Sequence, residues 1–529
     1  MKVFLLSLVM YMIYLFLKTK KSLHMLQQNR YNRGNKYLKW IGDNLEKNFL
    51  NLEIILLIFP MFYNMESQTL GVFFNTLYFI FIGRFLFQSK HEHTKVPLNY
   101  TGRLKRLYFT SIFIYVLVII ISSFLIQEKT IFYLYFLTIL MYFNNLVVVL
   151  ANIINVPIEH MVNNHFKNKA QNKLKNMTGL EVIGITGSYG KTSSKNILND
   201  VLNVKFNVLP TPKNYNTPTG LMITVNEYLD KFNDYFIAEM GACKTKEIKE
   251  LCDLVHPKYG ILTKIGVAHL ETFGSQENIQ KTKFELIESL PKDGIGILNA
   301  DDKLQVSYKL QNHVRIIWIG IDNTSKADVY ANNIRLSKDG TTFDCHFKEE
   351  NKTVTFTTKL LGKANIYNIL AAVALGEALG LTKEELELGV KKVNPVEHRL
   401  ELKRYYDMYL IDDAYNANPD GAKMALDVLN LMPGKKIIIT SGMIELGEKS
   451  EELNKELGRT IADVVDIAIL IGEKQTKPIQ DGLLEKQFDR KNIIIFNDIQ
   501  ESFSYLQKIK EKDAYILLQS DLPDIFNER

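Results

Sequence analysis

The first 155 residues of this 529-residue chain contain five long apolar runs, which limit what this segment can fold into. A helix needs about 20 mostly apolar residues to cross the hydrocarbon of a bilayer. The last three runs meet that length, whereas the first two are short enough to be interfacial helices. The sequence therefore predicts about five membrane spans, over residues 3–17, 49–64, 70–88, 108–126 and 131–154.

The charge of this part of the chain also favours a membrane. Residues 1–178 carry 20 Lys and Arg against 7 Asp and Glu, whereas the rest of the chain has a net charge of about −7. Because the basic residues flank apolar runs, we expect a membrane surface and no nucleic acid as the partner. A buried all-helical domain is the alternative, and it would leave this charge asymmetry unexplained.

The distribution of basic residues predicts the orientation. Segments 18–48 and 89–107 are rich in Lys and Arg, whereas the alternate loops, MESQTL and QEKT, have one basic residue between them. Basic loops stay in the cytoplasm. Five crossings then place the N-terminus outside and everything after about residue 155 in the cytoplasm. The first run resembles a signal peptide, but KTKKS follows it in place of a small-residue cleavage site.

After a basic polar segment, which is typical of a surface helix or linker, short apolar runs alternate with helical patterns. This alternation predicts an α/β fold with a largely parallel sheet. The pattern restarts near residue 397 with five further strand-like runs, which predict a smaller, Rossmann-like doubly wound sheet. The expected domains are a transmembrane region (1–155), a linker (156–178), a central P-loop domain (179–396) and a C-terminal domain (397–529).

A phosphate-binding motif opens the central domain. The stretch GITGSYGKTSSKN lacks the first glycine of a Walker loop, but it fits T-G-x-x-G-K-T after a strand and before a helix. The glycines allow backbone N–H groups to approach phosphate oxygens, and the helix N-terminus favours anions. We expect Lys191 to contact the β- and γ-phosphates and Thr192 to bind Mg²⁺. The predicted loop residues are Thr186, Gly187, Ser188, Gly190, Lys191 and Thr192.

This variant of the loop resembles that of the Mur ligase family of ATP-dependent amide-forming enzymes, and the resemblance extends over nearly all of residues 180–529. EMGA, IGVAHLETFGS, KTKFEL, LGKANIYNILAA, EHRLE and IDDAYNANP resemble family segments in the same order. The resemblance implies two Mg²⁺ ions, one held by Thr192 and Glu239 and the other by His269 and a carbamylated lysine. Register favours Lys283 over Lys281 for that lysine. It further implies that Asn365 and Asn368 contact the adenine and that Asp413 contacts the ribose. Arg399 and Asn416 complete the implied nucleotide contacts.

The implied reaction joins a carboxylate to an amine. ATP phosphorylates the carboxylate and the amine attacks the acyl phosphate, so the catalytic set is Lys191, Lys283, His269 and Arg399. EMGA, DDAYNANP and MIELGEKS most resemble the family members that add D-alanyl-D-alanine to UDP-N-acetylmuramoyl-tripeptide. The expected partners are a muramoyl-peptide or related carboxylate acceptor and an amino acid or dipeptide donor, in cell-wall synthesis.

The chain departs from the family pattern at Lys264, Ala364 and Gly442, and none of these is a predicted ATP or metal residue. The larger departure is that membrane helices stand where such ligases carry a UDP-binding domain. Two alternatives stay open at this point: a membrane-associated ligase of another amide polymer, such as poly-γ-glutamate, and a non-enzymatic nucleotide sensor. The three scattered cysteines, Cys243, Cys252 and Cys345, indicate no disulfide framework or zinc site.

Overall fold

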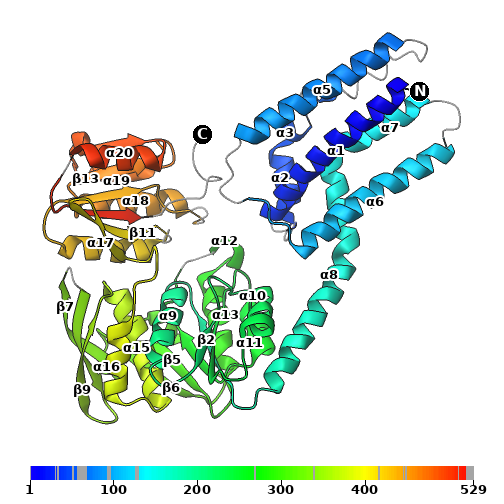
Figure 1. Ribbon diagram of the computed structural model, residues 1–529. Helices are drawn as coiled ribbons and strands as arrows, with labels where there is room; N and C mark the ends of the chain where they lie inside the picture. The colour runs from blue at the N-terminus through cyan, green and yellow to red at the C-terminus, as the bar shows by residue number, and fades with distance from the viewer. Residues whose placement is uncertain are drawn as a thin grey trace. The chain divides into compact units, whose positions relative to one another are not determined.

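The computed structural model forms two compact units, Met1–His165 and Phe166–Arg529, which we describe separately (Figure 1). The residues that it describes are 2–29, 31, 35–49, 53–55, 68–91, 97–125, 130–266, 270–337, 340–414, 418–444, 446, 449–509 and 511–519.

The described part of the first unit is helical. Two of its helices are long and apolar enough to cross a membrane, over Gly102–Ser122 and Asn144–Lys175. Core helices of soluble proteins pass the same test of length and composition, so the five spans stay a prediction. Most of the run at 49–64 lies outside the described residues. The helices are α1 (Lys2–Gln28), α2 (Lys36–Asp43), α3 (Leu45–Asn48), α5 (Gln68–His91), α6 (Gly102–Leu125), α7 (Thr130–Tyr142) and α8 (Asn144–Lys175).

The fifth apolar run differs from the expected single span, because a turn at Phe143 divides it between α7 and α8. The next two residues bond across to α1: Thr19 Oγ1 donates to Asn144 Oδ1 at 3.0 Å, and Ser22 Oγ donates to Asn145 Oδ1 at 2.6 Å. Helix α8 then continues without a break through the basic segment that follows, although Pro157 lies inside it. The predicted linker is therefore helical up to Lys175.

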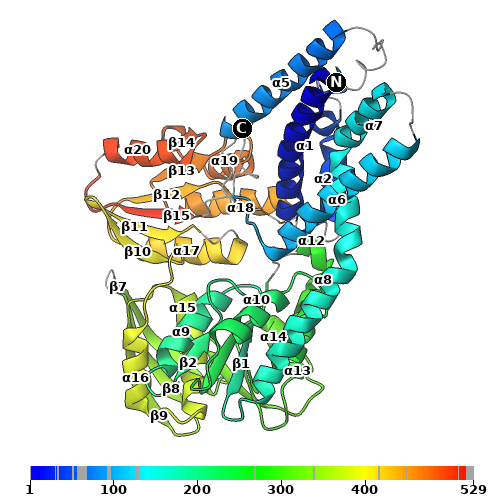
Figure 2. The same ribbon diagram turned by 45° about the vertical axis from the view of Figure 1, so that its right-hand side comes forward.

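The second unit begins with a nine-stranded sheet in the order β2-β3-β1-β4-β5-β6-β7-β8-β9. Neighbouring strands from β2 to β7 are parallel, and β7, β8 and β9 form antiparallel hairpins at one edge, beside α16 (Figure 2). The strands are β1 (Glu181–Thr186), β2 (Val208–Pro210), β3 (Tyr235–Glu239), β4 (Tyr259–Leu262), β5 (Ile295–Asn299), β6 (Arg315–Gly320), β7 (Val329–Ser337), β8 (Gly340–Phe347) and β9 (Lys352–Thr358).

Helices cover both faces of this sheet, as alternating β and α segments require. Ile183 and Ile185 of β1 pack with α9, α15 and α16 in one core, whereas Val182 packs with α11 and α13 in the other. The helices are α9 (Lys191–Leu202), α10 (Pro218–Ile223), the π-helix η3 (Thr224–Tyr228), α11 (Glu247–Val255), α12 (Leu270–Phe273), α13 (Gln276–Glu288), α14 (Lys303–Ser307), α15 (Lys363–Ala378) and α16 (Lys383–Lys392).

A second sheet of six strands has the order β10-β11-β15-β12-β13-β14. Its parallel strands are the five that the sequence predicts, and β10 adds an antiparallel edge. The α/β class with a largely parallel central sheet is confirmed. The elements are β10 (Glu401–Tyr405), β11 (Met408–Asp413), α17 (Pro419–Leu431), β12 (Lys436–Thr440), α18 (Ser450–Ala462), β13 (Ile467–Ile471), α19 (Lys477–Glu485), η5 (Arg490–Asn492), β14 (Ile493–Phe496), α20 (Ile499–Ile509) and β15 (Tyr515–Gln519).

Candidate active site

The loop between β1 and α9 requires its two glycines. Gly190, at the N-cap of α9, has φ +81°, in the left-handed region that favours glycine. Gly187 lies so close to the segment after β4 that a Cβ atom there would overlap Thr263 Oγ1. Thr263 Oγ1 in turn donates to Tyr189 O at 2.6 Å. The loop is thus fixed between β1 and the start of α9, where a helix N-terminus attracts an anion.

Lys191 folds back over this loop. Its Nζ atom donates to Gly187 O at 2.8 Å and to Ser188 O at 3.2 Å. Burial lowers the pKa of Lys191, the carboxylate of Glu239 opposes that shift, and the guanidinium of Arg399 adds to it. The ammonium group is therefore held at the loop by backbone carbonyls, at the end of α9 where phosphates bind in P-loops.

Glu239 ends β3 beside the start of α9 and is 1% exposed. Its Oε1 accepts hydrogen bonds from Thr192 Oγ1 and Asn216 Nδ2, both at 3.2 Å. Its Oε2 lies 3.2 Å from Lys195 Nζ, yet this buried oxygen has no hydrogen bond among the described residues. The ion pair thus compensates the charge without satisfying the oxygen.

Lys283 is buried on α13, whereas Lys281, two residues earlier, is exposed. Lys283 is 3% exposed, and its Nζ lies 5.9 Å from the centre of the Phe273 ring. Burial lowers its pKa to about 7, and the charge of Lys191 adds to the shift. The Nζ of Lys281 instead pairs with Glu277 at the surface, at 2.7 Å. Of the two lysines, Lys283 therefore has the more perturbed environment, near the loop.

A cavity of about 150 Å³ adjoins the loop at Tyr189 and Gly190. Asn368 lines it and lies against Gly190, since a Cβ on that glycine would be 3.3 Å from Asn368 Oδ1. Asn365 points elsewhere, because its Nδ2 donates to Leu361 O at 2.8 Å. Of the two asparagines that the sequence suggests for the adenine, Asn368 is the one that lines this cavity.

Asp413, the predicted ribose ligand, is 1% exposed at the end of β11. Its Oδ1 accepts a hydrogen bond from Leu400 N at 3.2 Å, and therefore anchors the backbone next to Arg399. Asp412 accepts from His398 Nδ1 at 2.8 Å, on the other side of Arg399. The two aspartates thus hold the segment that presents Arg399.

Two loop residues use their polar atoms within the protein. Thr186 Oγ1 donates to Met240 O at 2.8 Å, and Ser188 N donates to Lys264 O at 2.8 Å. Their nucleotide contacts stay a prediction. His269 and Asn416 lie outside the described residues. Within the described ranges, no group of three or more His, Cys, Asp or Glu side chains could hold a metal ion.

Sequence reasoning missed Lys195 and Asn216, which contact Glu239. Lys195 is 2% exposed, and its Nζ also donates to Thr211 O at 2.9 Å and Lys213 O at 2.6 Å. A lysine on a helix one turn after a phosphate loop gives no sequence signal of such a contact. For Asn216 the signal is its position in NYNTPTG, directly before the N-cap residue Thr217 of α10.

The comparisons with known proteins agree with this arrangement. Residues 185–376 match the Mur ligase middle domain and residues 398–520 the Mur ligase glutamate ligase domain. A UDP-N-acetylmuramoyl-tripeptide–D-alanyl-D-alanine ligase of Bacillus subtilis (strain 168) is 32% identical over 347 residues, which are 65% of this chain and 73% of that protein. This chain belongs to the Mur ligase family. It is therefore an ATP-dependent ligase, and the non-enzymatic sensor is excluded.

Two further Mur ligases agree. The Escherichia coli (strain K12) ligase of the same name is 32% identical over 295 residues, which are 55% of this chain and 65% of that protein. The crystal structure of MurF ligase from Thermotoga maritima in complex with ADP has a TM-score of 0.61 and 25% identity, covering 68% of this chain and 80% of that one. Parts of these proteins lie beyond the similarity, so the substrates of this chain are inferred below.

Proposed function

We propose that this chain joins D-alanyl-D-alanine to a muramoyl-tripeptide precursor at the expense of ATP, by way of an acyl phosphate. The observation that carries this proposal is the environment of Glu239, a buried carboxylate beside Thr192 with one oxygen that has no hydrogen bond to any residue that the structure describes. The relatives of this chain that carry the name UDP-N-acetylmuramoyl-tripeptide–D-alanyl-D-alanine ligase support the choice of substrates.

The side chains around Glu239 fit a Mg²⁺ ion. Magnesium prefers oxygen ligands and keeps several waters, so one carboxylate and one hydroxyl beside a phosphate are enough protein ligands. Thr192 and Glu239 supply that pair, and Mg²⁺ would neutralise charge on the phosphate oxygens during transfer. Asn216 holds the other side of the Oε1 atom.

Lys283 fits the role of a carbamylated lysine. Only a neutral amine adds to CO₂, and an ordinary lysine is almost fully protonated at neutral pH. Burial lowers the pKa of Lys283 to about 7, so far more of this amine is neutral at neutral pH than of an ordinary lysine. Carbamylation would replace a cation by an anion, which lowers the electrostatic cost of its place near Lys191. We assign Lys283 and His269 to a second Mg²⁺.

The proposed reaction has two steps, a phosphoryl transfer and an amide formation. A carboxylate oxygen of the acceptor attacks the γ-phosphorus of ATP, the bond to the β-phosphate oxygen breaks, and ADP leaves. The amine of the donor then attacks the acyl carbon, inorganic phosphate leaves with the bonding electron pair, and the amine loses a proton. Lys191 stabilises the charge on the leaving phosphate oxygens, since its ammonium lies at the loop.

Arg399 belongs to the C-terminal domain and contributes to the electrostatics of Lys191. We infer that it contacts the phosphates when that domain closes over the nucleotide. Closure would exclude water, which otherwise hydrolyses the acyl phosphate. Asp412 and Asp413 hold the segment on both sides of Arg399 for this role.

We further propose that the first unit anchors the ligase to the cytoplasmic face of a membrane. Helices α6 and α8 have the length and composition of spans. The basic segments 18–48 and 89–107 support the orientation by the positive-inside rule.

The test of this function is a ligation assay with the full-length chain in lipid nanodiscs. UDP-N-acetylmuramoyl-tripeptide, D-alanyl-D-alanine, ATP and Mg²⁺ are supplied, and the pentapeptide product and ADP are measured. We expect one ADP for each amide formed, and no product when any one of the four is omitted. ADP formation at the same rate without the peptide acceptor would contradict the proposal.

A further inference from the structure

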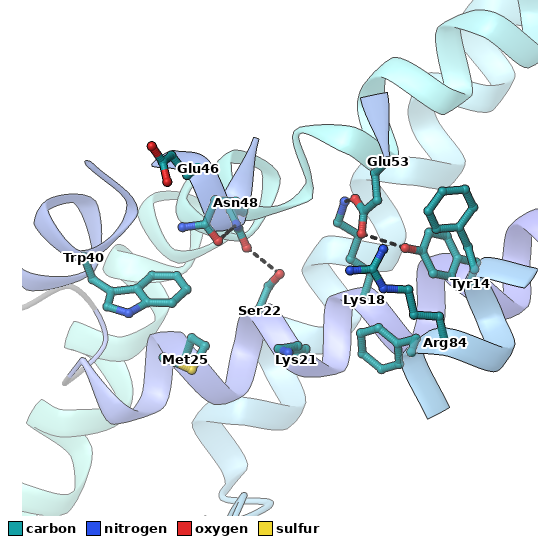
Figure 3. A pocket seen from close by; sticks show the side chains of 13 residues that line it. Tyr14, Lys18, Lys21, Ser22, Met25, Trp40, Glu46, Asn48, Glu53 and Arg84 are labelled. Atoms are coloured by element: carbon teal, nitrogen blue, oxygen red, sulfur yellow. Dashed lines mark hydrogen bonds and ion pairs between the residues drawn. The ribbon is translucent and has the colours of Figure 1, made fainter. Parts of the chain in front are cut away.

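A second cavity, of about 480 Å³, lies in the first unit, and none of its lining residues belongs to the ligase site described above. Such a volume is typical of sites for small ligands. We call it the α1–α5 pocket, and Figure 3 shows it from close by. Its lining includes Lys18, Lys21, Trp40, Glu53, Phe81 and Arg84.

One face of α1 forms a wall of the pocket. Tyr14, Lys18, Lys21, Ser22 and Met25 line it, at spacings of three and four residues that place them on one side of a helix. Figure 3 shows Tyr14, Lys18, Glu53 and Arg84 at one end and Met25 and Trp40 at the other. The apolar run of α1 ends at Leu17. The pocket therefore lies where α1 changes from apolar to basic.

The acidic side chains of the pocket are partly engaged already. Glu53 Oε1 accepts a hydrogen bond from Tyr14 Oη at 2.7 Å, and its Oε2 pairs with Lys18 Nζ. Glu46 is the other carboxylate in the lining, against the two further cations Lys21 and Arg84. Among the described lining residues, three cations therefore stand against two carboxylates.

A buried hydrogen-bond donor, which is uncharged, lies in the same lining. Asn48 Nδ2 is buried and has no hydrogen-bond partner among the described residues, although Asn48 Oδ1 accepts from Asn145 Nδ2 at 3.1 Å. An unsatisfied buried amide is costly, and a ligand oxygen would satisfy it. Ser22 Oγ donates to Asn145 Oδ1 at 2.6 Å, so this part of the wall is held by a polar network.

Aromatic rings complete the lining. Trp40 stacks on Tyr37 with the ring centroids 5.6 Å apart and the planes at 10°. Phe85 also lines the pocket, with Lys21 Nζ 5.7 Å from its ring centre. The pocket thus combines cations and an amide donor with flat apolar surfaces, which suits a ligand that has an anionic and an apolar part.

We propose that the α1–α5 pocket binds a phosphate- or diphosphate-bearing ligand, with its phosphate oxygens at Lys21, Arg84 and Asn48 and its apolar or planar part against Trp40. The arginine fork and the lysine ammonium both match phosphate oxygens. Two sources supply this chemistry: a lipid phosphate that enters from a bilayer, and a soluble sugar nucleotide. The residues of this pocket are distinct from those of the ligase site, so its ligand binding can be tested apart from ligation.

Tryptophan fluorescence tests the proposal directly, because the chain has only two tryptophans. The full-length Trp318→Phe variant in phosphatidylcholine nanodiscs reports on Trp40 alone. Geranylgeranyl diphosphate represents the lipid source, and UDP-N-acetylglucosamine represents the soluble source. We expect a saturable change in emission with at least one of them, and the tighter binder identifies the source.

Matched variants localise the binding. Lys21→Gln and Arg84→Gln should each weaken it about tenfold or more, the scale of a lost hydrogen bond to a charged group. Lys20→Gln removes the same charge from an exposed position of α1 that does not line the pocket, and should leave the affinity unchanged. Circular dichroism of each variant checks that the helices are intact. An emission change that does not saturate, or an equal loss in Lys20→Gln, would overturn the proposal.

Calorimetry on the chain without the tryptophan substitution gives a second readout. Calorimetry should give the same affinity as the fluorescence titration. In a separate fluorescence control, Trp40→Phe combined with Trp318→Phe should remove the remaining emission change. An absence of binding heat with both ligands and with inorganic diphosphate would also overturn the proposal.

Discussion

The ammonium group of Lys191 lies at the phosphate loop, where two backbone carbonyls of that loop accept hydrogen bonds from it. We predict that Lys191→Ala lowers the ligation rate at least about 100-fold, the scale of a lost electrostatic donor at a transition state. The measurement is ADP release with both substrates saturating. Lys249→Ala is the control, since the side chain of Lys249 pairs with the exposed Asp253 at the surface and its loss should leave the rate normal. A similar rate for Lys191→Ala and Lys249→Ala would rule out the phosphate role.

Lys283 and Lys281 offer a second matched pair. We predict that Lys283→Ala is nearly inactive, and that added short carboxylic acids partly restore it by taking the place of the carbamate. Lys281→Ala should remain active, because Lys281 makes a surface ion pair with Glu277. Initial rates with and without the added acid decide the question. Rescue of Lys281→Ala instead would show that the carbamylated position is two residues earlier.

The lowered pKa of Lys283 predicts that the stability of the protein depends on pH. In CO₂-free and Mg²⁺-free buffer the amine of Lys283 has a pKa of about 7 when folded, against 10.5 for an ordinary lysine. Between these pH values the unfolded chain binds a proton that the folded chain lacks, so the free energy of unfolding rises with pH. Urea unfolding of the wild type, measured relative to Lys283→Met, should show this rise from pH 7 to 10. A constant difference over that window would contradict the shift.

At this scale the sequence predicted side chains that follow a strand or a motif, and missed those that depend on tertiary contacts. Glu239 ends a buried strand and Thr192 follows the glycine loop, so the contact between these two side chains was predictable. The position of Lys195 was not predictable. Its buried ammonium bonds to the carbonyls of Thr211 and Lys213, and no local sequence pattern indicates these contacts. The amide nitrogen of Asn365 bonds to Leu361 O within the fold, which no local pattern indicates, and its contact with the adenine stays a prediction.

Among the elements, the loop between β1 and α9 has the strictest backbone requirements. We predict that Gly187→Ala weakens Mg-ATP binding at least about tenfold and lowers the urea midpoint, because its methyl group would overlap Thr263 Oγ1 and displace the loop. Gly274→Ala is the control. Its φ is +76° and no described atom lies within 4 Å of its Cβ position, so it should cost only about 1 kcal/mol of backbone strain. Normal ATP binding by Gly187→Ala would show that the loop does not hold the phosphates.

Strands that sequence patterns missed lie at the antiparallel end of each sheet. Strands β7, β8 and β9 form antiparallel hairpins of alternating buried and exposed residues, unlike the continuous apolar runs of β1 and β3. Strand β10 reads ELKRY, and none of its residues is fully buried. Buried parallel strands leave a strong hydrophobic signal, whereas half-exposed edge strands do not. The division of the fifth apolar run at Phe143 likewise depends on side-chain bonds of Asn144 and Asn145 to α1.

The two units of the molecule share one element, since α8 begins in the first and ends in the second. Val148 belongs to a core of the first unit, and Ala170 is packed in a core of the second. Asn226 Nδ2 of the second unit donates to Phe166 O of α8 at 3.2 Å, and Gln171 Nε2 of α8 donates to Asp253 O at 3.0 Å. Residues 166–175 are thus part of the ligase fold, which argues that a ligase fragment should retain them.

An anchored ligase has a consequence for its choice of substrate. If the first unit lies in a membrane, the enzyme is confined to a thin layer, which raises the effective concentration of any acceptor held at the same bilayer. Basic residues near anionic headgroups add about 1 kcal/mol each to this surface attraction. We therefore predict that the full-length chain in anionic nanodiscs uses a lipid-linked muramoyl-tripeptide at least about tenfold more efficiently than a fragment of residues 160–529 does in solution.

The UDP-linked tripeptide serves as the internal standard, because it is soluble and gains nothing from the membrane. Its kcat/KM should be similar for the two proteins if the fragment is folded, so the ratio of the two acceptors isolates the effect of anchoring. Salt screens exposed charges. A higher salt concentration should therefore reduce the preference for the lipid-linked acceptor to the extent that this preference comes from electrostatic attraction to the membrane. If both proteins use the UDP-linked acceptor equally well and neither prefers the lipid form, the helices serve only to localise the ligase, and the acceptor is the soluble nucleotide.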